Sequence, residues 1–152
     1  SERGEEVAAT FKDLKEQTDQ TAAYYQQLGM GHGDKVMLIL KRHYQWWLSM
    51  LALHKLGAIA IPATHMLTAK DIAYRNQRAS VKAIVCCNDE YVTRQIKGSL
   101  PESPTVKVLV AVNSMAETAK PVPKGFHDFH NEWTKAPNSI VPALSTTTTT
   151  PC

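Results

Sequence analysis

The sequence predicts an α/β protein with three layers, in which a mainly parallel sheet of at least four strands is flanked by helices. Two observations support this prediction. Helical and strand-like patterns alternate along residues 1–112, and a helical segment separates each strand-like run from the next. Two parallel strands need a crossover connection of this kind, and the intervening helix covers a face of the sheet.

The strands are predicted from short apolar runs that are bounded by charged or turn-forming residues. An unbroken apolar run is typical of a strand that is buried on both faces, as the strands of a parallel sheet are. The four predicted strands are Val36–Leu40, Ala58–Ile61, Val81–Cys87 and Thr105–Val112.

The helices are predicted from apolar residues at helical spacing and from their end signals. Thr-x-x-Asp patterns at Thr10 and Thr68 indicate capped N-termini, and Gly29 and Gly57 indicate C-termini. The four helices are expected over residues 10–28, 44–56, 69–79 and 89–97.

The apolar sides of these elements predict the core. Trp47 and Leu51 lie on neighbouring positions of the second helix, and a tryptophan-rich apolar face is most often buried. We therefore expect Trp47, Leu51, Ile39, Ile84 and Val85 to be core residues.

The alternation of helical and strand-like patterns ends after residue 112. The segment 113–152 begins as a loop, contains FHDFHNEWTKA, which could form a short helix, and ends in a low-complexity run of threonine. We divide the chain accordingly into an α/β subdomain over residues 1–112 and a loop, short helix and tail over residues 113–152.

Composition excludes several classes of protein. The net charge of +3 comes from scattered residues and does not indicate nucleic-acid binding. No apolar run is long enough to span a membrane, and the first fifteen residues are too polar for a secretory signal. The adjacent Cys86 and Cys87 form no disulfide framework or zinc pattern, which suits a reducing compartment. These observations predict a cytoplasmic protein.

Two segments imitate a phosphate-binding loop. Gly29-Met30-Gly31-His32-Gly33 is rich in glycine, but it follows a helix and opens a strand, which is the reverse of the order that a dinucleotide fingerprint requires. We interpret it as a turn. The tail Ser145–Cys152 has no glycine or lysine, and threonines cannot readily form the backbone nest that holds phosphate.

No catalytic or metal-binding residue is predicted. His127 and His130 have the i, i+3 spacing that would place both rings on one helix face, but two ligands do not make a site. No serine or cysteine has a neighbouring base pattern for nucleophilic catalysis.

The region 10–112, and above all LKRHYQWWLSMLALHKLGAIAIPATHMLTAKDIAYRNQRASVKAIVCC from Leu40 to Cys87, resembles the N-terminal part of the AMP-forming acyl-CoA synthetases of the acetyl and medium-chain type. The segment Gly125–Trp133 resembles the short Trp-x-Asp-Phe element that precedes the ATP loop of this family. The resemblance implies an N-terminal piece of a ligase that joins a carboxylic acid to coenzyme A with ATP and magnesium. The phosphate loop and the catalytic lysine of the family have no counterpart here, so the chain is expected to need the remainder of the ligase and to be inactive alone, without a cofactor of its own.

The resemblance also suggests ligand contacts. Some members of the family hold the nucleotide end of coenzyme A with basic residues after the third strand, where Arg94 and Lys97 stand in this chain. Thr64, His65 and Met66 follow the second strand, and loops at the carboxyl ends of parallel strands are where such folds bind ligands. These three residues are expected near the acyl pocket.

Two other interpretations remain open. A stand-alone binding module of flavodoxin or receiver type has the same texture, although a receiver needs acidic residues where Lys41 and Arg42 follow the first strand. An interaction fragment whose Trp46 and Trp47 face is exposed would form a homo-oligomer instead.

Overall fold

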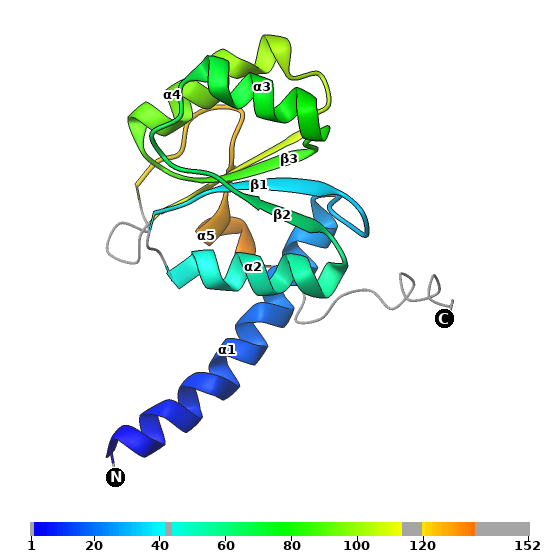
Figure 1. The fold of residues 1–152 in the computed structure, drawn as a ribbon. Helices are drawn as coiled ribbons and strands as arrows, with labels where there is room; N and C mark the ends of the chain where they lie inside the picture. The colour runs from blue at the N-terminus through cyan, green and yellow to red at the C-terminus, as the bar shows by residue number, and fades with distance from the viewer. Residues whose placement is uncertain (1, 42–43, 114–119, 136–152) are drawn as a thin grey trace, which may run out of the picture.

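The computed structural model describes residues 2–41, 44–113 and 120–135, with the side chains of all of these except 2–13, 44 and 45 (Figure 1). Helices and strands alternate through most of this length. The elements are α1 Glu2–Gln27, β1 Lys35–Ile39, α2 Tyr44–Leu56, β2 Ile59–Pro62, α3 Ala69–Ala79, β3 Ala83–Cys87, α4 Glu90–Ser99, the 3-10 turn η1 Leu100–Glu102, β4 Val108–Val112, β5 His127–Asp128 and α5 Phe129–Trp133.

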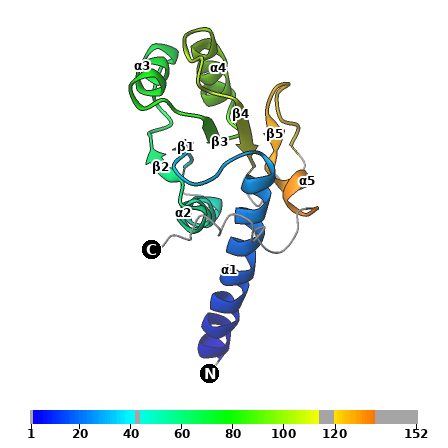
Figure 2. The ribbon, with the colours of Figure 1, turned by 90° about the vertical axis from the view of Figure 1, so that its right-hand side faces the viewer.

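The strands form one parallel sheet in the order β2-β1-β3-β4-β5. Helices α3 and α4 cover one face, and α1, α2 and α5 cover the other (Figures 1 and 2). The predicted three-layer α/β fold is therefore confirmed, and all four predicted strands are present with small shifts of their ends. The fifth strand has two residues, so it carried no periodic signal in the sequence.

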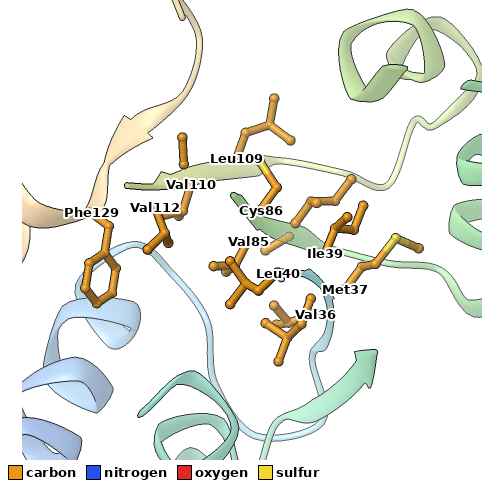
Figure 3. Packing of buried hydrophobic residues seen from close by; sticks show 14 of the residues in the cluster. Val36, Met37, Ile39, Leu40, Val85, Cys86, Leu109, Val110, Val112 and Phe129 are labelled. Atoms are coloured by element: carbon orange, nitrogen blue, oxygen red, sulfur yellow. The ribbon is translucent and has the colours of Figure 1, made fainter. Parts of the chain in front are cut away.

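The core lies on both faces of the three central strands. Val36 to Leu40, Ala83 to Cys87 and Leu109 to Val112 are all buried, and Figure 3 shows several of these side chains meeting across the sheet. The predictions for Ile39, Ile84 and Val85 are confirmed, because each is at most 1% exposed. Phe129 of α5 extends this core toward α1 (Figure 3).

The prediction for the second helix is wrong in its choice of face. Trp47 is 62% exposed and Leu51 41% exposed, whereas Leu48, Ala52 and Leu56 are buried. Helix α2 is apolar around nearly its whole circumference, so the period of its apolar residues could not select the side that packs on the sheet.

The predicted start of the first helix is also wrong. Helix α1 begins at Glu2, so Thr10 lies within it rather than at its N-cap. The capping box at Thr68 is present, because the Thr68 hydroxyl accepts from the Asp71 backbone N–H at 3.3 Å and the Asp71 carboxylate accepts from the Thr68 backbone N–H at 3.3 Å. A Thr-x-x-Asp pattern starts a helix only where the residues before it leave the helical conformation.

The free edge of β2 is poorly suited to pairing with another strand. The Ile59 and Ala63 N–H groups donate to Asp34 and Leu38 of the β1 side. Alternate residues of a parallel strand face the same neighbour, so Ala60 and Pro62 face outward. Proline has no N–H, and the strand therefore presents little hydrogen-bonding capacity at this edge.

Gly57 closes the α2–β2 connection in a conformation that other residues avoid. Its φ is +76°, and a Cβ atom there would lie 2.5 Å from Nδ1 of His32. Its carbonyl accepts from the Gly33 N–H at 2.9 Å, which ties the turn before β1 to the start of β2. The positive φ is therefore the reason why this position favours glycine, since the exposed His32 ring can move away from a Cβ.

We expect Gly57→Ala to lower the free energy of unfolding by about 1–2 kcal/mol, because a Cβ makes the left-handed region costly. Chemical denaturation followed by circular dichroism measures this. Gly31→Ala is the matched control, since no atom lies within 4 Å of a Cβ built at Gly31. Equal stabilities of the two variants would contradict the assignment.

Candidate functional site

The carboxyl ends of all five parallel strands lie at one edge of the sheet, and this is where open α/β sheets bind ligands. Polar residues follow three of the strands within two positions of the strand end. Lys41 comes after β1, Asn88 and Asp89 come after β3, and Asn113 comes after β4. We take this edge and the elements that border it as the candidate site.

An ion pair joins the ends of β1 and β3. Lys41 Nζ lies 3.2 Å from Asp89 Oδ2, and Asp89 Oδ1 accepts from the Val92 N–H at 3.2 Å as the N-cap of α4. The Val92 N–H and then the Lys41 ammonium lower the pKa of Asp89, while the bond to Asp89 raises the pKa of Lys41. The pair therefore stays charged at neutral pH.

A second network joins β3, β4 and the segment that leads to β5. Asn88 Nδ2 donates to Asn113 Oδ1 at 2.7 Å, and Asn113 Nδ2 donates to the Lys120 carbonyl at 2.8 Å. Lys120 Nζ in turn donates to the Asn88 carbonyl at 2.9 Å. These three residues were not singled out from the sequence as a site, although a polar residue directly after an apolar strand is a usable signal.

The two histidines with metal-like spacing have separate protein partners. His127 Nδ1 lies 3.0 Å from Glu132 Oε1, and His130 Nε2 lies 2.9 Å from the Asn113 carbonyl. Within residues 2–41, 44–113 and 120–135, no group of three or more His, Cys, Asp and Glu side chains could hold a metal ion. His130 instead contributes to the network at the carboxyl edge.

Arg94 and Lys97 lie on α4, which begins at this edge. The Arg94 side chain is 65% exposed, and its Nη1 lies 3.9 Å from Glu90 Oε1. Lys97 is exposed and its Nζ lies 6.0 Å from the centre of the Phe126 ring. Both residues are accessible to a ligand, and their role in binding stays a prediction.

Thr64, His65 and Met66 form the exposed loop between β2 and α3. The Met66 N–H donates to Thr64 Oγ1 at 3.2 Å, and Met66 is 70% exposed. The start of α3 then packs on α4, because the Ala69 N–H donates to Gln95 Oε1 at 2.8 Å. The loop of Thr64, His65 and Met66 therefore leads into a helix that contacts α4, which carries Arg94 and Lys97. Contact of the loop with an acyl group stays a prediction.

Cys86 and Cys87, the cysteines among the residues that the structure describes, offer no nucleophile. Cys86 is fully buried and Cys87 is 3% exposed, and both are free thiols. Burial raises the pKa of each thiol above its usual value, so both remain protonated at neutral pH.

The glycine-rich segment forms the turn that the sequence predicted. Residues 28–34 connect α1 to β1, and the Asp34 carboxylate holds them by accepting from the Gly31 N–H at 2.9 Å and from Lys82 Nζ at 3.0 Å. The threonine-rich segment Ser145–Cys152 lies outside the described residues.

Comparison with known families favours one of the open interpretations. The family described as AMP-binding enzyme matches residues 2–148. The chain belongs to this family. Membership favours the ligase interpretation over a flavodoxin-like or receiver-like module, which the α/β texture alone could not exclude.

The relatives and a solved structure agree with this assignment. The chain is 34% identical over 112 residues to the mitochondrial acyl-coenzyme A synthetase ACSM1 of Mus musculus, which covers 73% of this chain and 19% of the relative. It is 40% identical over 83 residues to the mitochondrial acyl-coenzyme A synthetase ACSM5 of Rattus norvegicus, covering 54% of this chain and 14% of the relative. The chain therefore spans a fifth or less of the length of these relatives.

The fold is shared with the anthranilate CoA ligase AuaEII, solved in complex with anthranoyl-AMP. The TM-score is 0.75 at 18% sequence identity, and the match covers 86% of this chain and 24% of the ligase. At this identity the likeness shows the fold alone.

The prediction of a cytoplasmic protein is wrong, because the relatives are mitochondrial synthetases. It rested on the absence of a hydrophobic signal and on cysteine usage. Mitochondrial transit peptides are amphipathic rather than hydrophobic, so neither observation could separate the two compartments. Among the described helices, none is long and apolar enough to cross a membrane.

We expect Asp89→Asn to keep the N-cap of α4 but to lose the ion pair, which lowers stability at pH 7 by less than about 1 kcal/mol because the pair is partly exposed. Folding depresses the pKa of Asp89, so its contribution is present above the unfolded value of about 3.9 and is lost as the pH falls through the lower folded value. Denaturation curves from pH 7 to pH 2 should show the difference from wild type shrinking.

The same substitution in a Lys41→Met background is the control for this prediction. If the ion pair carries the effect, the pH-dependent difference that Asp89→Asn causes should be clearly smaller in this background. An equally large pH-dependent difference in both backgrounds would assign the effect to the bond between the Asp89 carboxylate and the Val92 N–H.

Proposed function

We propose that this chain forms the first parallel sheet of an AMP-forming ligase that joins a carboxylic acid to coenzyme A, and that it acts together with the remainder of that ligase. The family match over residues 2–148, with relatives that are acyl-CoA synthetases, is the observation that carries the proposal. The whole enzyme would convert the acid and ATP into an acyl-adenylate and pyrophosphate. It would then transfer the acyl group to the thiol of coenzyme A and release AMP.

In this enzyme the sheet binds and positions ligands rather than performing chemistry. The thiols of Cys86 and Cys87 are buried and protonated, and Asp89 and Lys41 at the carboxyl edge pair with each other. The described residues do not fit magnesium, because they hold no cluster of acidic side chains. Magnesium would therefore be held by the remainder of the ligase.

Arg94 and Lys97 would bind the nucleotide end of coenzyme A. Its phosphates carry several negative charges, and a guanidinium can donate two parallel hydrogen bonds to one phosphate. Glu90 is 91% exposed and lies 3.9 Å from Arg94, so it holds the guanidinium only weakly and can release it to a phosphate. Lys97 is one turn further along the same helix and adds a second positive charge.

The loop of Thr64, His65 and Met66 would lie beside the acyl group. Met66 presents an exposed, flexible apolar side chain, which suits contact with an acyl chain of variable shape. Thr64 fixes the loop through its bond to the Met66 N–H. In this proposal the apolar contact lies on the loop before α3 and the phosphate contacts lie on α4, and the Ala69–Gln95 bond joins the two helices.

We expect Arg94→Glu with Lys97→Glu, introduced into a ligase that contains this sheet, to raise the KM for coenzyme A about tenfold or more, because two attractive contacts with phosphate become repulsive. Adenylate formation, measured as carboxylate-dependent exchange of pyrophosphate into ATP, should change little. Arg78→Glu is the matched control, since Arg78 is an exposed arginine on the neighbouring helix α3. An unchanged KM in the double variant would return both residues to ordinary surface charges.

We expect the 152-residue chain alone neither to form acyl-adenylate nor to bind magnesium-ATP with micromolar affinity. Stabilising the charge on transferred phosphate needs positioned amides and cations, and losing one such donor can cost about a hundredfold in rate. Pyrophosphate release with acids from acetate to medium chain, and calorimetric titration of magnesium-ATP, measure this. Mouse ACSM1 serves as the positive control for both assays. Turnover by the isolated chain would reveal a site beyond the sheet described above.

A further inference from the structure

The Lys97 ammonium lies over the ring of Phe126, and this contact joins helix α4 to the segment that leads into β5. The distance from Nζ to the ring centre is 6.0 Å. A cation at this distance is attracted by the negative face of an aromatic ring. Lys97 belongs to the last turn of α4, whereas Phe126 immediately precedes β5, so the contact exists only because the fold brings these two segments together.

Packing and pairing fix the position of the Phe126 ring. Phe126 is 8% exposed and belongs to the hydrophobic core. Its N–H donates to the Pro123 carbonyl at 3.2 Å, and the next residue, His127, pairs with Val110 of β4. The ring therefore offers a platform of defined position to the lysine side chain that rests on it.

The backbone of Lys97 is fixed by the buried side of α4. Ile96 is fully buried, and Ser99 is 1% exposed and donates from its Oγ to the Ile96 carbonyl at 2.6 Å. An exposed lysine on such a helix ordinarily samples many rotamers, and ordering it on a ligand costs free energy. Contact with the Phe126 ring restricts those rotamers before a ligand binds, so part of this cost is removed.

The contact leaves the positive charge of Lys97 available. Lys41, Lys55 and Lys82 each pair with an aspartate, whereas Lys97 has no ion pair within the part of the chain that the structure describes. An aromatic face carries no net charge, so it holds the ammonium without neutralising it. The N–H groups that point away from the ring can still donate to an anion.

The other cation over an aromatic ring lacks this combination. On α3, the Arg78 guanidinium lies 5.7 Å from the centre of the Tyr74 ring, but Tyr74 is itself 62% exposed. An exposed ring on a helix surface is free to move with the cation and gives it no defined position. The Tyr74–Arg78 pair is therefore a matched control of similar distance and different burial.

We propose that Phe126 is a positioning residue for coenzyme A, whose ring holds the Lys97 ammonium where it meets a phosphate of the nucleotide end. This inference rests on the proposed function, in which Arg94 and Lys97 bind that end. Arg94 precedes Lys97 by one turn, so both cations lie on one side of α4. Phe126 acts through Lys97 and does not itself contact the ligand, so its effect is on the affinity for coenzyme A.

The test measures the steady-state kinetics of a complete ligase that contains this sheet. Phe126→Leu keeps a large apolar side chain in the core but removes the ring, and should raise the KM for coenzyme A about threefold. The KM for ATP and the kcat at saturating coenzyme A should change less, because a general defect of the core would alter these as well. Tyr74→Leu removes the control ring and should leave the KM for coenzyme A unchanged.

A double-mutant cycle with Lys97→Met shows whether Phe126 acts through Lys97. Lys97→Met should raise the KM for coenzyme A at least as much as Phe126→Leu, and adding Phe126→Leu to it should cause no further rise. An equal effect of Phe126→Leu in both backgrounds would overturn the proposal. A rise with Lys97→Met but not with Phe126→Leu would overturn the positioning role alone, whereas no rise with Lys97→Met would also refute the Lys97 contact of the proposed function.

A second measurement uses the unchanged 152-residue chain, so it does not depend on the folding of a variant. Protons above the face of an aromatic ring resonate upfield of their usual position. The ε-methylene protons of Lys97 should therefore lie upfield of those of Lys107, an exposed lysine that contacts no ring among the described residues. Proton–carbon correlation NMR measures both. Equal chemical shifts for the two lysines would show that the ring does not hold Lys97 and would overturn the proposal.

Discussion

The burial of β1, β3 and β4 on both faces is the constraint on which the rest of the structure depends. A strand inside such a sheet cannot give its backbone N–H and C=O groups to water, so each group must find a partner within the protein. The central strands meet this requirement by pairing on two sides, as β1 does with β2 and β3. Every connection must then pass over a face of the sheet, and all strands end at one edge. The polar network at that edge follows from this arrangement.

The features that could be predicted from the sequence are those whose signal lies within a few neighbouring residues. The apolar runs identified the strands around Ile39, Ile84 and Val85 because burial on both faces leaves no polar residue in the run. The N-cap at Thr68 could also be predicted, since both partners of the capping box lie within three residues of each other in the sequence. The orientation of α2 could not be predicted, because Trp47 and Leu48 are both apolar and only the packing of the helix against α1 and β2 distinguishes them.

The candidate site was predictable to a lesser degree, and for the same reason. Asn88 and Asn113 are 25 residues apart, and their hydrogen bond exists only because β3 and β4 are neighbours in the sheet. Strand β5 is likewise defined by its partner, since two residues have no period of their own. Arg94 and Lys97 came from a family resemblance rather than from residue patterns, and the structure adds their exposure and their neighbours Glu90 and Phe126.

Helix α5 fastens the far end of the described chain to its beginning. The Tyr24 hydroxyl donates to Glu132 Oε1 at 3.1 Å, and burial together with the nearby carboxylate raises the pKa of Tyr24, so the phenol keeps its proton. Trp133 Nε1 donates to Thr21 Oγ1 at 2.9 Å, and Phe129 packs edge-on against Tyr24. These contacts make one tightly packed cluster between α1 and α5.

The α5 cluster and the network at the carboxyl edge together hold the scaffold on which the candidate ligand contacts stand. Lys120 is bound to β3 and β4 at one end of the segment 120–135, and Trp133 is bound to α1 at the other. Arg94 projects from α4, whose N-cap Asp89 pairs with Lys41 after β1, whereas Met66 belongs to the exposed loop between β2 and α3. Because ordering a side chain costs less free energy than ordering a loop, a ligand contact at Arg94 would require less ordering than one at Met66.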